Sequence, residues 1–225
     1  GSFTESFPLF GLDLADYDRL FAEKLDLWAA LQGEGTVTWD AGELRPPLRG
    51  ARIFPRTERG SIPTWIGVGG SPESVVRTAR YGFPLMLAII GGDPARFGPY
   101  TDLYRRALQE LEQPDLPIGV HSPGFVADTD EEARELLYPH FKAQRDRIGA
   151  ERGWGPVTRA QYDAEVDHGA LFVGSPETVA RKIATTVRVL GIQRFDLKYS
   201  NGGVPHERAM RSIELYGTRV IPRVR

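Results

Sequence analysis

Three continuous apolar runs, each followed by a helical segment, constrain this chain most strongly. The runs span residues 64–68, 84–90 and 118–121, and the first two end in the glycine pairs 69–70 and 91–92. Strands that are apolar throughout, rather than alternating, are buried on both faces of a sheet. The helices between them predict parallel pairing through right-handed crossovers. The predicted fold class is therefore α/β.

The repeating strand–helix unit fits a (β/α)₈ barrel of the TIM type, in which eight units of about 30 residues make about 250. Four barrel strands are predicted near residues 65, 85, 119 and 196, which amounts to half a barrel with insertions. Residues 1–225 are expected to form a single domain, with an irregular loop at 40–62 and an irregular insertion at 149–169. A doubly wound sheet is the alternative, but no Gly-x-Gly-x-x-Gly turn supports it.

Composition excludes several classes of protein. The chain has 28 Lys and Arg against 30 Asp and Glu, a net charge of −2, which argues against a nucleic-acid partner. It has no cysteine, so a disulfide scaffold and a thiolate nucleophile are excluded. The apolar runs are far shorter than the roughly 18 residues of a membrane span. A cytoplasmic protein without a membrane partner is expected.

The turn at residues 69–74 (GGSPES) carries the clearest binding signal. Ser71 is a predicted N-cap with Pro72 at the first helical position. Helix N-termini bind phosphate through bare N–H groups, and the hydroxyls of Ser71 and Ser74 add donors. A capped helix without a ligand is the alternative interpretation, because residues 174–178 (GSPET) repeat the pattern. The first copy follows the stronger strand and is the better candidate.

Other candidates lie at the ends of predicted strands, where barrels place reactive groups. His121 ends the third run and could contact substrate or transfer a proton, although a hydrogen-bonded structural histidine is the alternative. Tyr199 and Ser200 follow the last strand and are placed to touch substrate. Asp196 within that strand is expected to form an ion pair. The remaining histidines lack ligand spacing, so no metal site is predicted.

Four segments together resemble the bacterial luciferase-like flavin monooxygenases: residues 7–11 (FPLFG), 65–74 (WIGVGGSPES), 82–92 (GFPLMLAIIGG) and 174–178 (GSPET). The resemblance implies a (β/α)₈ barrel that binds reduced flavin, usually FMN, at its carboxyl face and uses O₂ to oxygenate an organic substrate. Such enzymes often receive reduced flavin from a separate reductase. A close variant of the family uses the deazaflavin F420 and transfers hydride.

The resemblance also implies roles for individual residues. Gly70, Ser71 and Ser74 match the phosphate-binding turn after the fifth barrel strand. Ser2 and Phe3 match positions along the flavin ring after the fourth strand, and Ile89 matches a ring-facing position in the sixth. The residues of this sequence thus correspond to the end of strand four and to strands five to eight, the carboxyl-terminal portion of the barrel.

The family's first four strands, with a phosphate-clamping arginine and a catalytic histidine, have no counterpart in this sequence. An amino-terminal half or self-association is expected to cover the open barrel, because exposed parallel edges associate readily. A non-catalytic fragment or assembly subunit is therefore one alternative function. A sugar-phosphate enzyme on the same barrel is another, since a phosphate turn does not specify whose phosphate it holds. The substrate is not readable from these residues.

Overall fold

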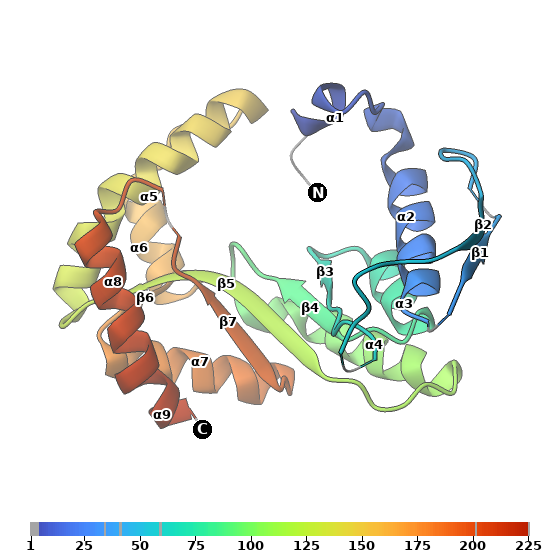
Figure 1. The fold of residues 1–225 in the computed structure, drawn as a ribbon. Helices are drawn as coiled ribbons and strands as arrows, with labels where there is room; N and C mark the ends of the chain where they lie inside the picture. Colours follow the sequence, from blue (N-terminus) through green and yellow to red (C-terminus); the bar gives the residue numbers. More distant parts are fainter. Residues whose placement is uncertain (1–4, 34, 41, 59, 201, 225) are drawn as a thin grey trace. The chain divides into compact units, whose positions relative to one another are not determined.

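The computed structural model describes residues 5–33, 35–40, 42–58, 60–200 and 202–224. Its contacts group into two compact units, Gly1–Thr64 and Trp65–Arg225. Figure 1 shows the elements of both units along the chain. The larger unit contains the parallel sheet, and the smaller one contains a long helix and a short hairpin.

The smaller unit is built on one long amphipathic helix. The Asp13 carboxylate accepts a hydrogen bond from the Ala15 N–H at 2.9 Å, so Asp13 caps the short 3₁₀ helix that leads into this long helix. Trp39 is buried and donates from Nε1 to the Asp26 carboxylate at 2.9 Å, which ties the hairpin to the helix. The elements are α1 (Ser6–Leu9), η1 (Leu14–Asp16), α2 (Tyr17–Leu31), β1 (Val37–Trp39) and β2 (Leu48–Ala51).

The larger unit alternates strands and helices, as the apolar runs predict. Its first half contains β3 (Ile66–Val68), α3 (Pro72–Arg80), β4 (Leu85–Ala88), η2 (Pro94–Phe97), α4 (Gly98–Glu110) and β5 (Ile118–Val126). Its second half contains α5 (Asp130–Arg152), α6 (Arg159–Asp167), β6 (Phe172–Gly174), α7 (Pro176–Leu190), β7 (Arg194–Lys198), α8 (His206–Leu215), η3 (Tyr216–Val220) and α9 (Ile221–Val224).

All strand pairs in this unit are parallel, which confirms the predicted α/β class. The order is β3-β4-β5-β6, and β7 also pairs with β5. The long strand β5 makes this branching possible. Its residues 119–123 pair with β7, and its residues 124–126 pair with β6. The four predicted barrel strands are therefore found as β3, β4, β5 and β7.

The two faces of this sheet differ in burial. Leu85, Leu87 and Val120 are fully buried, and their positions along β4 and β5 place them on one face of the sheet. Helices α3, α4 and α7 run along the sheet (Figure 1). Residues in register on parallel strands point to the same face, so Ala88 and His121 share the opposite face. Both are only partly buried. The partly open face and the carboxyl ends of the strands therefore position the candidate site.

Both segments expected to be irregular contain regular structure. Residues 40–62 include β2, which pairs antiparallel with β1. Its side chains are half-buried or exposed, so it carries no apolar run to mark it. Residues 149–169 include the end of α5 and all of α6, which begins with a capping box between Thr158 and Gln161. Helix α5 continues to Arg152 because Gly153, at φ +72°, is the first residue to adopt the left-handed conformation that ends it.

Candidate functional site

The turn after β3 has the geometry predicted for residues 69–74. Gly70 adopts φ +125°, and its carbonyl accepts a hydrogen bond from the Tyr100 hydroxyl at 2.8 Å. Ser71 is the N-cap of α3, and its Oγ accepts from the Ser74 N–H at 3.2 Å. The structure therefore brings Gly70, Ser71 and Ser74 together at the start of one helix, beside the carboxyl end of β3.

Two charged side chains of α3 flank these serines. The Ser71 hydroxyl donates to the Glu73 carboxylate at 2.8 Å, and Arg77 Nη2 donates to Ser74 Oγ at 3.1 Å. Hydrogen bonds from its own backbone N–H and from Ser71, with the nearby Arg77 cation, lower the pKa of the Glu73 carboxyl below its usual value. Arg77 is thus the cation nearest the serine hydroxyls in sequence and contacts one of them directly. Sequence analysis missed it, although it lies one helical turn beyond Ser74.

The second copy of the motif, at residues 174–178, has a different environment. There Asp130 accepts a hydrogen bond from the Ser175 N–H at 2.6 Å and from the Thr178 hydroxyl at 2.9 Å. Burial raises the pKa of Asp130, but the hydrogen bonds from Ser175 and Thr178 outweigh it and the pKa lies below its usual value. A protein carboxylate therefore occupies the anion position of this helix end. At the first copy, the Ser71 hydroxyl instead contacts Glu73 of its own helix.

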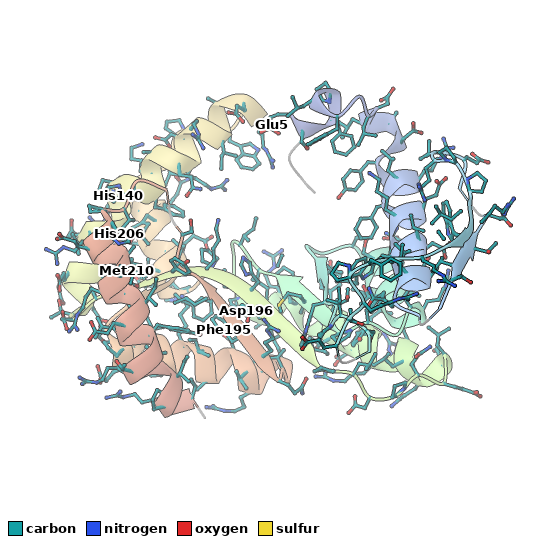
Figure 2. All side chains as sticks on the ribbon, viewed as in Figure 1. Glu5, His140, Phe195, Asp196, His206 and Met210 are labelled. Atoms are coloured by element: carbon teal, nitrogen blue, oxygen red, sulfur yellow. The ribbon has the colours of Figure 1, made fainter. Side chains whose placement is uncertain are left out.

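His121 has a carboxylate as its neighbour across the sheet. The register pairs His121 with Asp196 of β7, so both side chains belong to the open face. Asp196 accepts from Arg194 Nε at 2.8 Å, which confirms the expected ion pair and identifies Arg194 as the partner. The Arg194 guanidinium also lies 5.0 Å from the centroid of the Trp65 ring. Figure 2 labels Asp196 and its neighbour Phe195 on β7.

The remaining predicted residues are placed differently from one another. Tyr199 is half exposed and Ser200 is exposed, both directly after the carboxyl end of β7. Ile89 is fully buried, whereas the next residue, Ile90, is 74% exposed. Ile90, not the predicted Ile89, is therefore the exposed isoleucine at this strand end. Ser2 and Phe3 lie outside the described residues.

Glu165, far along the chain from β4, binds the backbone of the turn after that strand. Both carboxylate oxygens of Glu165, on α6, accept hydrogen bonds from the Gly92 N–H, at 3.0 and 3.1 Å. Oε2 of Glu165 also accepts from the Ala170 N–H at 3.1 Å. Sequence analysis gave Glu165 no role, because the contact spans 73 residues and depends on tertiary structure.

Near this contact, Lys182 of α7 donates hydrogen bonds to the backbone at and after the end of α6. Its Nζ donates to the carbonyls of Val166 and Leu171, each at 2.7 Å. Burial is the main cause that lowers its pKa to about 8. Because its donors are directed at backbone carbonyls, Lys182 stabilises a helix end rather than presenting a nucleophile to a ligand.

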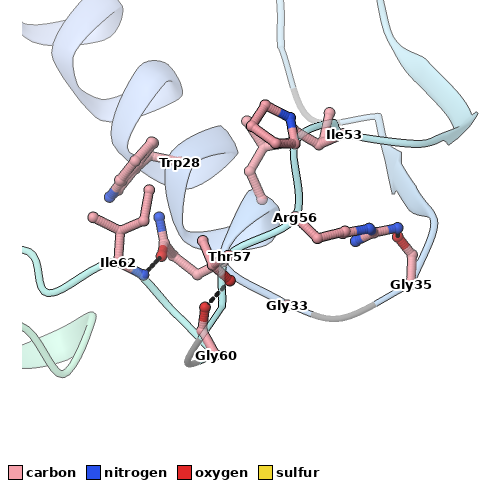
Figure 3. A pocket seen from close by; sticks show the side chains of 11 residues that line it. Trp28, Gly33, Gly35, Ile53, Arg56, Thr57, Gly60 and Ile62 are labelled. Carbon is pink, nitrogen blue, oxygen red and sulfur yellow. Dashed lines mark hydrogen bonds between the residues drawn. The ribbon is translucent and has the colours of Figure 1, made fainter.

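The smaller unit has a cavity of about 430 Å³ of its own (Figure 3). Arg56 is the charged residue among its described lining residues, and its Nη2 donates to the Gly35 carbonyl at 2.6 Å. The Ile62 N–H donates to Gln32 Oε1 at 2.8 Å across the cavity rim. With Trp28 and Ile53 in its walls, this cavity is apolar and holds no acid–base pair among those residues.

No group of three or more His, Cys, Asp or Glu side chains in the described ranges is arranged to hold a metal ion. None of the helices in those ranges is both long and apolar enough to span a membrane.

The parallel sheet, with helices between its strands, defines an α/β protein of the barrel type. The family model for luciferase-like monooxygenases matches residues 1–194. The chain therefore belongs to the luciferase-like monooxygenase family, as the sequence resemblance predicts. No curated protein sequence matches the chain.

Solved structures of low sequence identity share the fold. The monooxygenase RslO1 from Streptomyces bottropensis aligns with a TM-score of 0.76 and 19% identity over 99% of this chain and 66% of its own. The FMN-bound oxygenating constituent of 3,6-diketocamphane monooxygenase from Pseudomonas putida has a TM-score of 0.72 and 18% identity, over 100% and 69%. The coenzyme F420-dependent tetrahydromethanopterin reductase from Methanopyrus kandleri has a TM-score of 0.61 and 15% identity, over 95% and 65%. The chain thus spans about two thirds of the length of these structures.

Proposed function

We propose that this chain carries the cofactor-phosphate site of a flavin-dependent monooxygenase that uses reduced FMN and O₂ on an organic substrate. The observation that carries the proposal is the difference between the helix ends at residues 69–74 (GGSPES) and 174–178 (GSPET). One helix end is occupied by the Asp130 carboxylate, and the other is left to Gly70, Ser71 and Ser74 at the carboxyl edge of the sheet. Family membership supports the same assignment.

The residues at this turn fit a phosphate monoester. The α3 N-terminus supplies the positive end of a helix dipole, and Gly70 lets the backbone approach a ligand closely. The hydroxyls of Ser71 and Ser74 can donate to phosphate oxygens, and Arg77 beside Ser74 offsets the Glu73 charge. A bound phosphate oxygen would replace the Glu73 carboxylate as the acceptor of the hydrogen bond from the Ser71 hydroxyl. When bound, reduced FMN supplies the electrons that activate O₂.

The substrate-side residues complete the proposal. Ile90 offers an apolar surface at the end of β4, where a planar ring can lie. His121 is proposed to contact substrate, because it lies on the open face of the sheet beside its cross-strand neighbour Asp196. Tyr199 and Ser200 contribute hydroxyls from the adjoining strand end.

We also propose that additional polypeptide covers the free edge of β7 in the active enzyme. Among the described strands, β7 pairs with β5 alone, and such exposed edges associate. A second copy or a further segment of a longer chain could supply the cover, and a separate reductase would deliver the reduced flavin. A monomer in size-exclusion chromatography that binds no hydrophobic dye would contradict this proposal.

The cofactor proposal is tested by titrating the protein with reduced FMN and with reduced riboflavin, which lacks the phosphate. Wild type should bind FMN more tightly, and Ser71→Asp should weaken FMN by at least about tenfold through like-charge repulsion. Riboflavin affinity should be unchanged. Aspartate is as good an N-cap as serine, so the helix should remain intact.

The outcomes separate the alternatives. Loss of the FMN preference in Ser71→Asp supports the phosphate site, and an unchanged preference contradicts it. Tighter binding of F420 than of FMN would assign the site to the hydride-transfer variant of the family. Failure of wild type to discriminate FMN from riboflavin would contradict the phosphate site.

A further inference from the structure

A cavity of about 490 Å³ lies between the carboxyl-terminal half of α5, the segment after it, and α6. Its walls are mostly apolar, and its volume is in the range of about 300–1,000 Å³ that small-molecule sites occupy. The lining residues that matter for recognition are Phe141, Arg145, Trp154, Val157, Ala164 and Glu165.

Hydrogen bonds to α5 fix the segment that forms one wall. The Trp154 N–H donates to the Gly149 carbonyl at 2.8 Å. The Val157 N–H donates to the Asp146 carboxylate at 2.7 Å, and Lys142 Nζ donates to the Val157 carbonyl at 3.0 Å. Lys142 and Asp146 also pair with each other at 2.6 Å. The segment after α5 that forms this cavity wall is therefore fixed to the helix by hydrogen bonds.

Glu165 connects this cavity to the candidate active site. Its side chain lines the cavity, and its carboxylate accepts hydrogen bonds from Gly92 in the turn after β4. That turn directly follows the exposed Ile90 at the carboxyl edge of the sheet. Glu165 is therefore the residue shared by the cavity wall and the turn after β4.

Arg145 and Trp154 give the cavity a chemical preference. The Arg145 guanidinium lies 4.5 Å from the Trp154 ring centroid, and no carboxylate of the described residues forms an ion pair with it. Trp154 remains 46% exposed, although burial of such a ring is favourable. Arg145 on the α5 wall attracts an anion, whereas the Glu165 carboxylate on the α6 wall repels one.

We propose that this cavity binds an amphiphilic organic acid whose apolar body packs against Trp154, Phe141 and Val157 and whose acid group pairs with Arg145. The charges of Arg145 and Glu165 orient the acid group toward α5 and the apolar end toward the turn at Gly92. This assignment of the cavity as an organic-acid site is independent of the proposed flavin function.

The test is a calorimetric titration of the full chain with 2-naphthoate and with its neutral isostere 2-naphthamide. Wild type should bind naphthoate at least about fivefold more tightly, and Arg145→Gln should abolish that preference. Trp154→Ala should weaken both probes by at least about fivefold. The matched control is Arg147→Gln, an exposed arginine two residues along α5 that does not line the cavity.

Each outcome decides the proposal. An unchanged naphthoate preference in Arg145→Gln, or an equal loss in Arg147→Gln, overturns it. Unchanged binding of both probes in Trp154→Ala also overturns it, provided that thermal melting shows a folded protein. The FMN and riboflavin titrations on the same variants separate the two proposals, because the phosphate preference should survive both cavity substitutions.

Discussion

Glu165 and Gly92 lie 73 residues apart, and both carboxylate oxygens of Glu165 accept the same Gly92 backbone N–H, at 3.0 and 3.1 Å. The side chain also accepts from Ala170, so it connects the turn after β4 with the turn after α6. Gly169 is required in that second turn, because a Cβ there would lie 2.1 Å from Glu165 Oε2. One carboxylate therefore determines the position of the strand end that presents Ile90.

Glu165→Gln should loosen the turn after β4. Glutamine preserves the length of the side chain but replaces one charged oxygen with an amide NH₂ group, so a single neutral oxygen remains to accept from Gly92 and Ala170. Hydrogen bonds to charged groups contribute about 1.5–3 kcal/mol, so the free energy of unfolding should fall by about that amount. Urea denaturation measures the loss, and hydrogen exchange at the Gly92 amide should become faster.

Glu151→Gln is the matched control, because Glu151 is exposed near the end of α5. It should change neither the stability nor the exchange at Gly92. If Glu165→Gln left the Gly92 exchange rate at its wild-type value, the carboxylate would not be what holds this turn.

Asp130→Asn should destabilise the start of α7 in a pH-dependent way. The folded pKa of Asp130 lies below its usual value of 3.8, so its stabilisation is present above pH 3.8 and is lost as the pH falls through the folded pKa. At pH 7 the variant should lose about 1–2 kcal/mol of unfolding free energy. Denaturation at pH 7 and at about pH 3 measures this. A difference between wild type and variant that does not shrink in acid would contradict the assignment.

Sequence patterning predicts the parallel sheet because each main strand is a local signal. The residues of β4 lie within one continuous apolar run, and those of β3 lie within another, which ends at a glycine pair. In contrast, β2 is half-buried or exposed along its length and pairs with only one other strand. Nothing in its own residues distinguishes it from a loop, so pairing with β1 had to be seen in the structure.

The candidate site is predictable to the extent that its contacts are local. Ser71 caps α3 by accepting a hydrogen bond from the N–H of Ser74, only three residues away, so the motif itself encodes this contact. The carboxylate that occupies the helix end at the second motif belongs to Asp130, 45 residues before Ser175. His121 and Asp196 become neighbours only through the register of β5 and β7. Such pairs depend on which strands and helices pack together, and the spacing of residues in one sequence does not encode them.

Lys182 should make the stability of the protein rise between about pH 8 and pH 10.5. Burial lowers its folded pKa from 10.5 to about 8, so in this window the unfolded chain binds more protons than the folded one. Stability therefore increases with pH there, by up to about 3 kcal/mol. Lys182→Met removes this titration, and comparing the two proteins cancels the contribution of tyrosines. Parallel pH profiles of unfolding free energy for wild type and variant would contradict the prediction.

Gly70→Ala should destabilise the turn at the candidate phosphate site. At φ +125° an alanine is strained, and the cost of such a conformation is about 1–3 kcal/mol. The Gly70 carbonyl accepts from Tyr100, so the strain cannot be relieved without loss of that hydrogen bond. Gly67→Ala is the matched control, since a Cβ at Gly67 in β3 would meet nothing within 4 Å. Urea denaturation should show a loss for Gly70→Ala and none for Gly67→Ala, and the preference for FMN over riboflavin should fall only in the former. If both substitutions left that preference intact, the backbone at Gly70 would not contribute to a phosphate site.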